Sequence, residues 1–136
     1  MLVVDCSVAV KWFLEEPGDR EALALLRTGE RLIAPELIVA ELVNVLWKRV
    51  TTGAIGHSQA ADVPQAIPTT LAELCPLAPL AARALAIAGE LRHPAYDCFY
   101  LALAETRDLK LITADRRLVA RLAGSPWQDR CLRLWN

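Results

Sequence analysis

The chain has 136 residues, of which 54% are hydrophobic and 23% are charged, and its formal net charge is −1 at pH 7. This length fits a single domain with a substantial apolar core, so we predict one domain over residues 1–136. The longest apolar runs are short and interrupted by charge, which excludes a membrane-spanning segment. The start, MLVVDCSV, has an acid at its fifth position and no basic stretch, so we expect no signal peptide and a cytoplasmic protein.

Short apolar segments alternate with helical patterns along the first half of the chain. The predicted elements are a strand at 2–4, helices at 8–14 and 20–28, a strand at 31–34 and a helix at 36–50. Ser7 is a suitable N-cap for the first helix, Gly29 stops the second, and Pro35 starts the third.

The same alternation continues in the second half. The predicted elements are a helix at 57–67 broken or bent by Pro64, a strand at 71–74, a helix ending at 91, a helix that starts near Pro94, a strand at 110–113, a helix at 116–122 and a strand at 131–134. Alternation of this kind predicts a mostly parallel sheet with helices on both faces. The short, wholly apolar strand at 2–4 should be central.

Three carboxylates, Asp5, Asp97 and Asp115, fall at strand ends or helix starts. In an open parallel sheet, ligand sites lie outside the carboxyl ends of the strands. Asp5 and Asp115 each come just after a predicted strand, and Asp97 in the first turn of its helix could face Asp115. The alternative is structural, because an acid at a helix start can cap the helix or favour its dipole. Ser7 could cap the first helix, which leaves Asp5 without that role.

A fourth acid, Glu41, lies beside the apolar stripe of the helix at 36–50, and Asn44 and Lys48 share its face. A glutamate in the middle of a helix is more often simply exposed to solvent. Four carboxylates in one cleft would repel one another unless a cation neutralised them. Oxygen ligands select Mg²⁺ or Mn²⁺ over zinc, and the chain has two histidines and no Cys-x-x-Cys pair. Because such an ion takes further ligands from water and phosphate, the pattern indicates phosphodiester hydrolysis.

Other phosphate chemistries fit the sequence poorly. It has no Gly-rich phosphate loop and no nucleophile set beside a His–Asp pair. An aspartyl-phosphate phosphatase would need a second Asp where Ser7 stands. Two alternatives stay open: a non-catalytic RNA- or protein-binding module on the same fold, and a small-molecule phosphatase on a similar sheet. The four acids argue against the binding module, since they repel a phosphate backbone unless metal intervenes.

Four segments, in this order, resemble the PIN-domain family, and most closely its VapC-type toxin ribonucleases: VVDCSVAVKWFLEE, APELIVAELVNVLWK, AYDCFYLALAE and LITADRRL. The resemblance implies an α/β fold of three layers, α/β/α, with a five-stranded parallel sheet. It also implies a Mg²⁺- or Mn²⁺-dependent endoribonuclease in which water attacks a phosphate of the RNA substrate. The catalytic, metal-binding acids of the family match Asp5, Glu41, Asp97 and Asp115.

Further polar residues match positions around these acids. Ser7 matches the family's hydroxyl position after the first Asp, and Thr113 matches the small polar residue two before the last. We expect Ser7 and Thr113 to orient carboxylates or metal-bound water rather than to react. Asn44 could also reach the cleft from the face of Glu41.

The resemblance further implies a small VapB-like antitoxin as partner, and a homodimer. Apolar side chains on the early helices could line a groove for an amphipathic antitoxin helix, or could be ordinary core: Trp12, Phe13, Val45 and Trp47. Arginines crowd the last fifth of the chain, where such a run is more often a solvated face than a binding surface: Arg116, Arg117, Arg121, Arg130 and Arg133.

Overall fold

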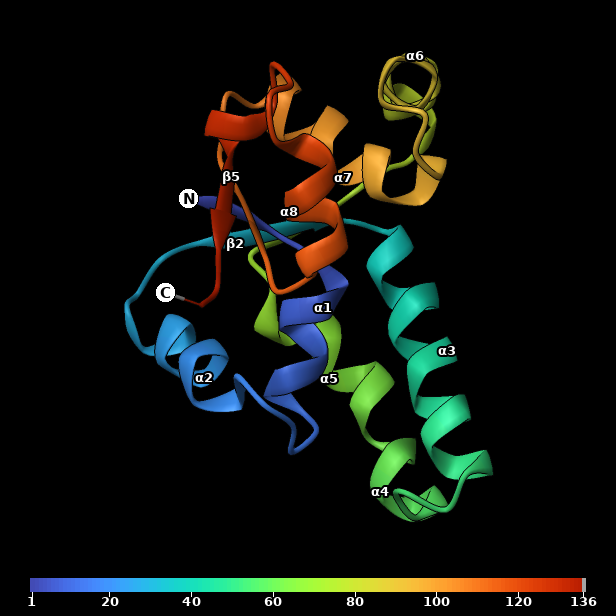
Figure 1. Cartoon of the computed structure of the whole chain (residues 1–136). Coiled ribbons are helices and arrows are strands. Elements are labelled where there is room, and N and C mark those ends of the chain that lie inside the picture. Colours follow the sequence, from blue (N-terminus) through green and yellow to red (C-terminus); the bar gives the residue numbers. More distant parts are fainter. Residues whose placement is uncertain (136) are drawn as a thin grey trace.

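The computed structural model describes residues 1–135, and its five strands form one parallel sheet with the order β3-β2-β1-β4-β5 (Figure 1). The strands are β1 (Leu2–Val4), β2 (Leu32–Pro35), β3 (Glu73–Cys75), β4 (Leu111–Thr113) and β5 (Cys131–Arg133). The predicted three-layer α/β/α fold is confirmed, and β1 is the central strand as predicted. The predicted strands at 71–74 and 131–134 differ from β3 and β5 by one or two residues at their ends.

The helices follow the strands in the alternation that the sequence predicts. They are α1 (Cys6–Ala9), α2 (Asp19–Arg27), α3 (Leu37–Thr51), α4 (His57–Ala61), α5 (Val63–Thr70), α6 (Ala81–Leu91), α7 (Ala95–Thr106) and α8 (Arg116–Leu122), with short 3-10 turns η1 (Val10–Trp12), η2 (Ala78–Leu80) and η3 (Gln128–Arg130). Figure 1 shows α6 and α7 on one side of the strands and α1 and α2 on the other. No helix within residues 1–135 is long and apolar enough to cross a membrane.

The central strands of the sheet carry apolar residues on both faces of the sheet. Val3 and Val4 in β1 are fully buried, and all four residues of β2 are buried. A parallel sheet covered by helices on both faces needs such uninterrupted apolar strands. In the register of the sheet, Val4 pairs with Ile112 of β4. Strands β1 and β4 therefore end side by side, and the residues after them emerge together.

Helix α7 is the most deeply buried helix, and it packs against β1, β2 and β4 on one side and α6 on the other. Its apolar residues surround much of the helix, with Cys98 and residues 100–104 all buried. A helix that is apolar nearly all round is typical of a central position. This packing directs the first turn of α7, which carries Asp97, to the carboxyl end of the sheet.

Several predicted boundaries are wrong, and the causes are local. The helix predicted at 8–14 starts earlier, at Cys6, and changes to a 3-10 turn at Val10. Asp5 rather than Ser7 occupies the N-cap position, and its side chain does not cap the helix. Pro35 ends β2 instead of starting α3. Of the two alternatives at Pro64, a break or a bend, the structure has the break: Pro64 lies in the first turn of α5, where a proline is tolerated, and the helix predicted at 57–67 is two helices.

Candidate acidic active site

Asp5 emerges from the end of β1 and is held by two hydroxyl groups. Its side chain is only 5% exposed, and its Oδ2 accepts hydrogen bonds of 2.7 Å from both Ser7 Oγ and Thr113 Oγ1. The main-chain N–H of Ala114 donates to Ser7 Oγ at 2.9 Å. The two hydroxyls come from opposite ends of the sequence, so the pairing of β1 with β4 sets the orientation of this carboxylate.

Asp115 follows β4 and caps α8. Its Oδ1 accepts from the main-chain N–H groups of Arg117 and Leu118 at 2.8 and 3.2 Å. The buried Thr113 hydroxyl also accepts from the N–H of Asp115 at 3.0 Å. The structural alternative for Asp115, an N-cap, is therefore confirmed, but the cap uses one carboxylate oxygen and leaves the other free for a further role.

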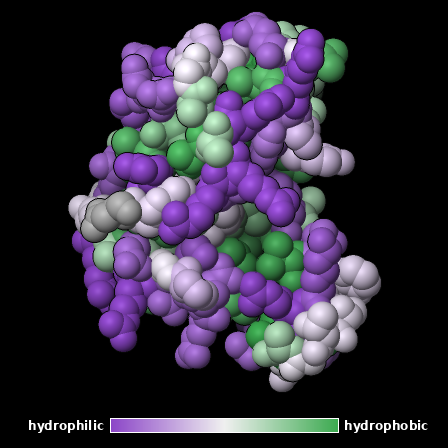
Figure 2. Space-filling view, viewed as in Figure 1, coloured by the Kyte–Doolittle hydropathy of each residue, from purple (hydrophilic) through white to green (hydrophobic). Residues whose placement is uncertain are grey.

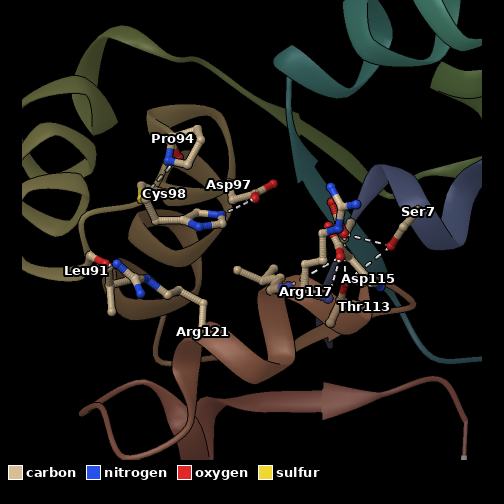
Figure 3. A network of polar contacts seen from close by, with 12 residues as sticks. Ser7, Leu91, Pro94, Asp97, Cys98, Thr113, Asp115, Arg117 and Arg121 are labelled. Atoms are coloured by element: carbon tan, nitrogen blue, oxygen red, sulfur yellow. Dashed lines mark hydrogen bonds and ion pairs between the residues drawn. The ribbon is translucent and has the colours of Figure 1, made fainter.

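The other two acids are carried by helices, and each is held by one side chain. Glu41 of α3 is partly buried, and its Oε1 accepts a hydrogen bond of 2.6 Å from the Tyr100 hydroxyl of α7. Asp97 Oδ2 lies 2.5 Å from Nε2 of His93, four residues earlier. In Figure 3, the Asp97 carboxylate points from α7 toward the region that holds Ser7, Thr113 and Asp115.

The four carboxylates interact electrostatically. Burial raises the pKa of Asp5 to about 6, and the negative charges of Asp97 and Asp115 add to this rise, while the Ser7 and Thr113 hydroxyls oppose it. Burial likewise raises the pKa of Glu41 to about 7, with the Tyr100 hydrogen bond opposing the rise. The charges of Asp5 and Asp97 raise the pKa of Glu41 further. Asp5 is thus coupled to Asp97 and Asp115, and Glu41 is coupled to Asp5 and Asp97.

The carboxylate oxygens of these four acids are suitable ligands for a hard divalent cation. Each carboxylate has one oxygen in a hydrogen bond, and within residues 1–135 the second oxygen of each accepts none. Carboxylate oxygens are the ligands that Mg²⁺ and Mn²⁺ prefer. Among the same residues, however, no three His, Cys, Asp or Glu side chains form a group that could already hold a metal ion. Binding an ion would therefore require these side chains to draw closer together.

The structure brings Ser7 and Thr113 into this group, next to Asp5, where the sequence predicts orienting hydroxyls. Asn44 lies exposed on α3, and no hydrogen bond within the described chain joins it to the acids.

Two partners of the acids, His93 and Tyr100, were missed in the sequence. The spacing of four residues between His93 and Asp97 was a usable signal, although Pro94 interrupts it. Tyr100 is fully buried and fits the apolar pattern of α7, which conceals the role of its hydroxyl.

The predicted apolar groove on the early helices is mostly core. Trp12 and Phe13 pack edge to face with ring centroids 6.3 Å apart, and Trp12 Nε1 donates to the Ala22 carbonyl at 3.0 Å. Val45 is partly buried against the core, whereas Trp47 on the outer side of α3 is 61% exposed. Figure 2 shows separate hydrophobic areas set among hydrophilic side chains on the face that it draws.

A five-stranded parallel sheet with coupled carboxylates at its carboxyl edge defines an α/β domain with an acidic centre. Residues 2–124 match the family model described as the PIN domain. The chain belongs to the PIN-domain family, as its four sequence segments predict.

Similar proteins agree with this assignment over most of their length. The chain is 34% identical to VapC ribonuclease Mb0985 of Mycobacterium bovis over 118 residues, which cover 87% of this chain and 88% of that protein. It is 28% identical to ribonuclease VapC3 of Pyrobaculum aerophilum over 122 residues, which cover 88% and 93%.

Solved structures share the fold. The crystal structure of PAE2754 from Pyrobaculum aerophilum matches with a TM-score of 0.70 and 25% identity, covering 91% of this chain and 81% of that chain. A toxin–antitoxin complex from Klebsiella pneumoniae matches with a TM-score of 0.69 and 20% identity, covering 100% and 99%. At 20% identity the second match is evidence for the fold alone.

Proposed function

We propose that the protein is a divalent-metal-dependent endoribonuclease, the toxin of a VapBC-type toxin–antitoxin system, that hydrolyses RNA phosphodiester bonds. The observation that carries the proposal is the group of four coupled carboxylates, none of which forms an ion pair with a Lys or Arg side chain within residues 1–135. The PIN-domain membership and the relatives named VapC ribonucleases support it. A cytoplasmic site of action, with access to cellular RNA, accompanies this proposal, as does a single domain over residues 1–136.

In this proposal the metal ligands and catalytic residues are Asp5, Glu41, Asp97 and Asp115. A bound Mg²⁺ or Mn²⁺ ion supplies activation of water and stabilisation of charge at the phosphate. The remaining work belongs to residues that hold the carboxylates. The Ser7 and Thr113 hydroxyls favour the ionised form of Asp5 and hold its Oδ2, which would leave Oδ1 available as a ligand for such an ion.

His93 and Tyr100 hold the two acids that helices carry, Asp97 and Glu41. Each contacts one oxygen of its carboxylate, Oδ2 of Asp97 or Oε1 of Glu41, and leaves the second oxygen available. A ligand that is oriented in advance loses less conformational freedom when the ion binds. Asn44 stays a weaker candidate on the exposed face of α3.

The test of this function is RNA cleavage by the purified protein, free of antitoxin, in Mg²⁺ or Mn²⁺ with EDTA controls. We expect discrete, metal-dependent cuts that leave 5′-phosphates in total cellular RNA, detected by sequencing the new ends. Asp97→Asn should keep the fold and lose the cuts. Asp62→Asn is the matched control, because Asp62 is exposed and lies between α4 and α5, away from the four acids.

Two outcomes would count against the proposal. Full cleavage by a folded Asp97→Asn variant would refute the role of that acid. RNA binding that needs no metal and leads to no cleavage would instead favour the non-catalytic binding module.

The proposed partner is a VapB-like antitoxin, with a homodimer of this chain. The relatives named VapC support an antitoxin partner, and the exposed Trp47 ring offers an apolar anchor on α3 for an antitoxin helix. Co-purification with the antitoxin encoded beside the gene tests this surface. Trp47→Ser should weaken the complex, and an unchanged complex would exclude Trp47 as an anchor.

A further inference from the structure

A pocket of about 250 Å³ opens beside the acidic centre but is lined by none of the four acids. Its walls include Ala114 and Arg116, the two residues that flank Asp115 in the sequence. Because the main-chain N–H of Ala114 also donates to Ser7 Oγ, this wall is continuous with the network around Asp5. A ligand in this pocket would therefore lie next to a ligand bound at the acids.

Arg116 is held in place by the indole ring of Trp135. The Arg116 Cζ atom lies 4.4 Å from the centroid of that ring, and Arg133 Cζ lies 6.0 Å from it. Stacking on an aromatic face fixes the plane of a guanidinium and leaves its N–H edge free to bind a planar or tetrahedral oxyanion.

Neither of these two arginines has a carboxylate partner within residues 1–135, in contrast to several arginines elsewhere. Arg83 is paired with Glu105 at 2.7 Å, and Arg107 is paired with Glu73 at 2.7 Å. Arg116 and Arg133 are both exposed, so two cations that form no ion pair within residues 1–135 meet at one aromatic ring. Charge complementarity therefore favours an anion beside Trp135.

Lys11, Gly18 and Glu21 also line the pocket. Lys11 is paired with Glu16 at 2.6 Å, so its ammonium group is held against that carboxylate and its aliphatic stem lines the pocket. Gly18 has a φ of +92°, and a Cβ there would come within 3.4 Å of that stem. The positive φ favours glycine at position 18. Glu21 is an exposed acceptor that could bind a hydroxyl or amino group.

We propose that this pocket is a nucleotide subsite for the RNA, and that Arg116, stacked on Trp135, binds a phosphate adjacent to the one that is cleaved. The inference rests on the proposed ribonuclease function and deepens it. The four acids repel an RNA backbone, so the chain needs cations close by to hold the neighbouring phosphates. The pocket provides such a cation at the edge of the acidic centre, together with an acceptor and an apolar wall for the rest of the nucleotide.

The test compares Arg116→Ala, Arg116→Lys and Trp135→Ala with Arg27→Ala. Arg27 is a matched control because it is exposed on α2, does not line the pocket and carries the same charge. Affinity is measured by fluorescence anisotropy of a labelled single-stranded RNA in Mg²⁺ at several salt concentrations. All variants are combined with Asp97→Asn for this measurement, so that the RNA remains intact. Cleavage kinetics are measured in chains that keep Asp97.

We expect Arg116→Ala to weaken RNA binding about 10-fold and to reduce the salt slope of log K by about one, because one phosphate contact is lost. In the kinetics, KM should rise while kcat changes little. Trp135→Ala should weaken binding less and keep the salt slope, since the charge remains. Arg116→Lys should also keep the slope but lose affinity, because lysine cannot stack or bind a phosphate through two N–H groups. Arg27→Ala should behave as the parent.

Failure of the subsite and failure of the ribonuclease function give different results. Suppose that the unsubstituted chain cleaves RNA with metal, but that both Arg116→Ala and Trp135→Ala keep the parental RNA affinity and KM. This result would overturn the subsite alone, and the pocket would then be assigned to a protein partner. Absence of cleavage by the unsubstituted chain would overturn the proposed function, and a 10-fold loss of RNA affinity in Arg116→Ala would then still identify the pocket as an RNA-binding site.

Discussion

Partly or fully buried carboxylates have two different kinds of surroundings in this molecule. Glu16 lies between two cations, with Lys11 Nζ and an Arg49 guanidinium nitrogen each 2.6 Å from its oxygens. Although burial alone would raise the pKa of Glu16, these two partners lower it below the ordinary value of 4.5. At the carboxyl edge of the sheet, Asp5 and Glu41 have only hydroxyl donors, and burial raises their pKa values to about 6 and about 7.

The difference shows that the chain neutralises an acid internally where that acid serves the fold. Lys11, in η1, donates its hydrogen bond to Glu16 rather than to Asp5, although it follows Asp5 by only six residues. The acids at the sheet edge are left to repel one another, which lowers stability unless an external cation joins them. The comparison therefore predicts opposite responses of the two regions to metal, to loss of a hydroxyl and to pH.

The largest expected effect is stabilisation by metal. Mn²⁺ added to EDTA-treated protein should raise the free energy of unfolding by about 2.7 kcal/mol when its concentration is 100 times the dissociation constant. Differential scanning calorimetry at increasing Mn²⁺ concentrations measures this gain. It should disappear in Asp5→Asn and persist in Glu16→Gln, because only the first change removes a proposed ligand.

A matched control separates specific binding from general screening of charge. K⁺ at equal ionic strength should give little of the gain, because screening acts weakly on buried groups. An identical melting temperature with and without Mn²⁺ would mean that the four acids do not act as a cation site.

The next effect comes from the hydroxyl of Thr113. Thr113→Val keeps the shape of the side chain but removes the donor to Asp5 and the acceptor of the Asp115 N–H, both of which are poorly exposed to water. We expect a loss of about 2 kcal/mol in urea unfolding, together with a loss of RNA cleavage.

Thr113→Ser is the control for this substitution, because it retains the hydroxyl and loses only a methyl group. It should recover most of the cleavage activity. If the valine variant were as stable and active as the parent, the orienting role of Thr113 would be wrong.

Much of this arrangement could be predicted from residues close together in the sequence. The short apolar segments at 2–4 and 110–113 indicated buried parallel strands, and the acid after each strand indicated the edge of the sheet that bears the site. Helix α8 was predicted with its observed bounds because Asp115 is a strong start signal and the apolar spacing after it is regular. Ser7 was misassigned as a cap because the same residue type both caps helices and binds carboxylates.

Contacts between distant segments could not be predicted in this way. The pairing of Tyr100 with Glu41 joins residues 59 apart, and the stacking of Arg116 on Trp135 depends on where the chain runs after β5. Such contacts depend on how helices pack on the sheet, which hydrophobic periodicity does not determine. The sequence left the boundary between α4 and α5 open for a different reason, since Pro64 is equally compatible with bending one helix and with starting another.

The smallest expected effect comes from two matched substitutions, Glu16→Gln and Glu41→Gln. Their stabilities are compared by urea unfolding in EDTA at several pH values. Glu16 has a lowered pKa in the folded chain, so its charge stabilises the fold above pH 4.5 and this contribution is lost as the pH falls. Glu16→Gln should therefore be less stable than the parent by about 1 kcal/mol at pH 7, and the difference should shrink toward pH 4.

Glu41 should give the opposite sign, because its pKa rises from 4.5 to about 7 on folding. The folded chain then binds more protons than the unfolded chain between these values, so the parent loses stability as the pH rises through this window. Glu41→Gln removes that loss and still accepts the Tyr100 hydrogen bond, so at pH 7 it should be about 1 kcal/mol more stable than the parent. Destabilisation of equal size by both substitutions at pH 7 would show that Glu41, like Glu16, serves the fold, and would remove the contrast on which the proposed cation site depends.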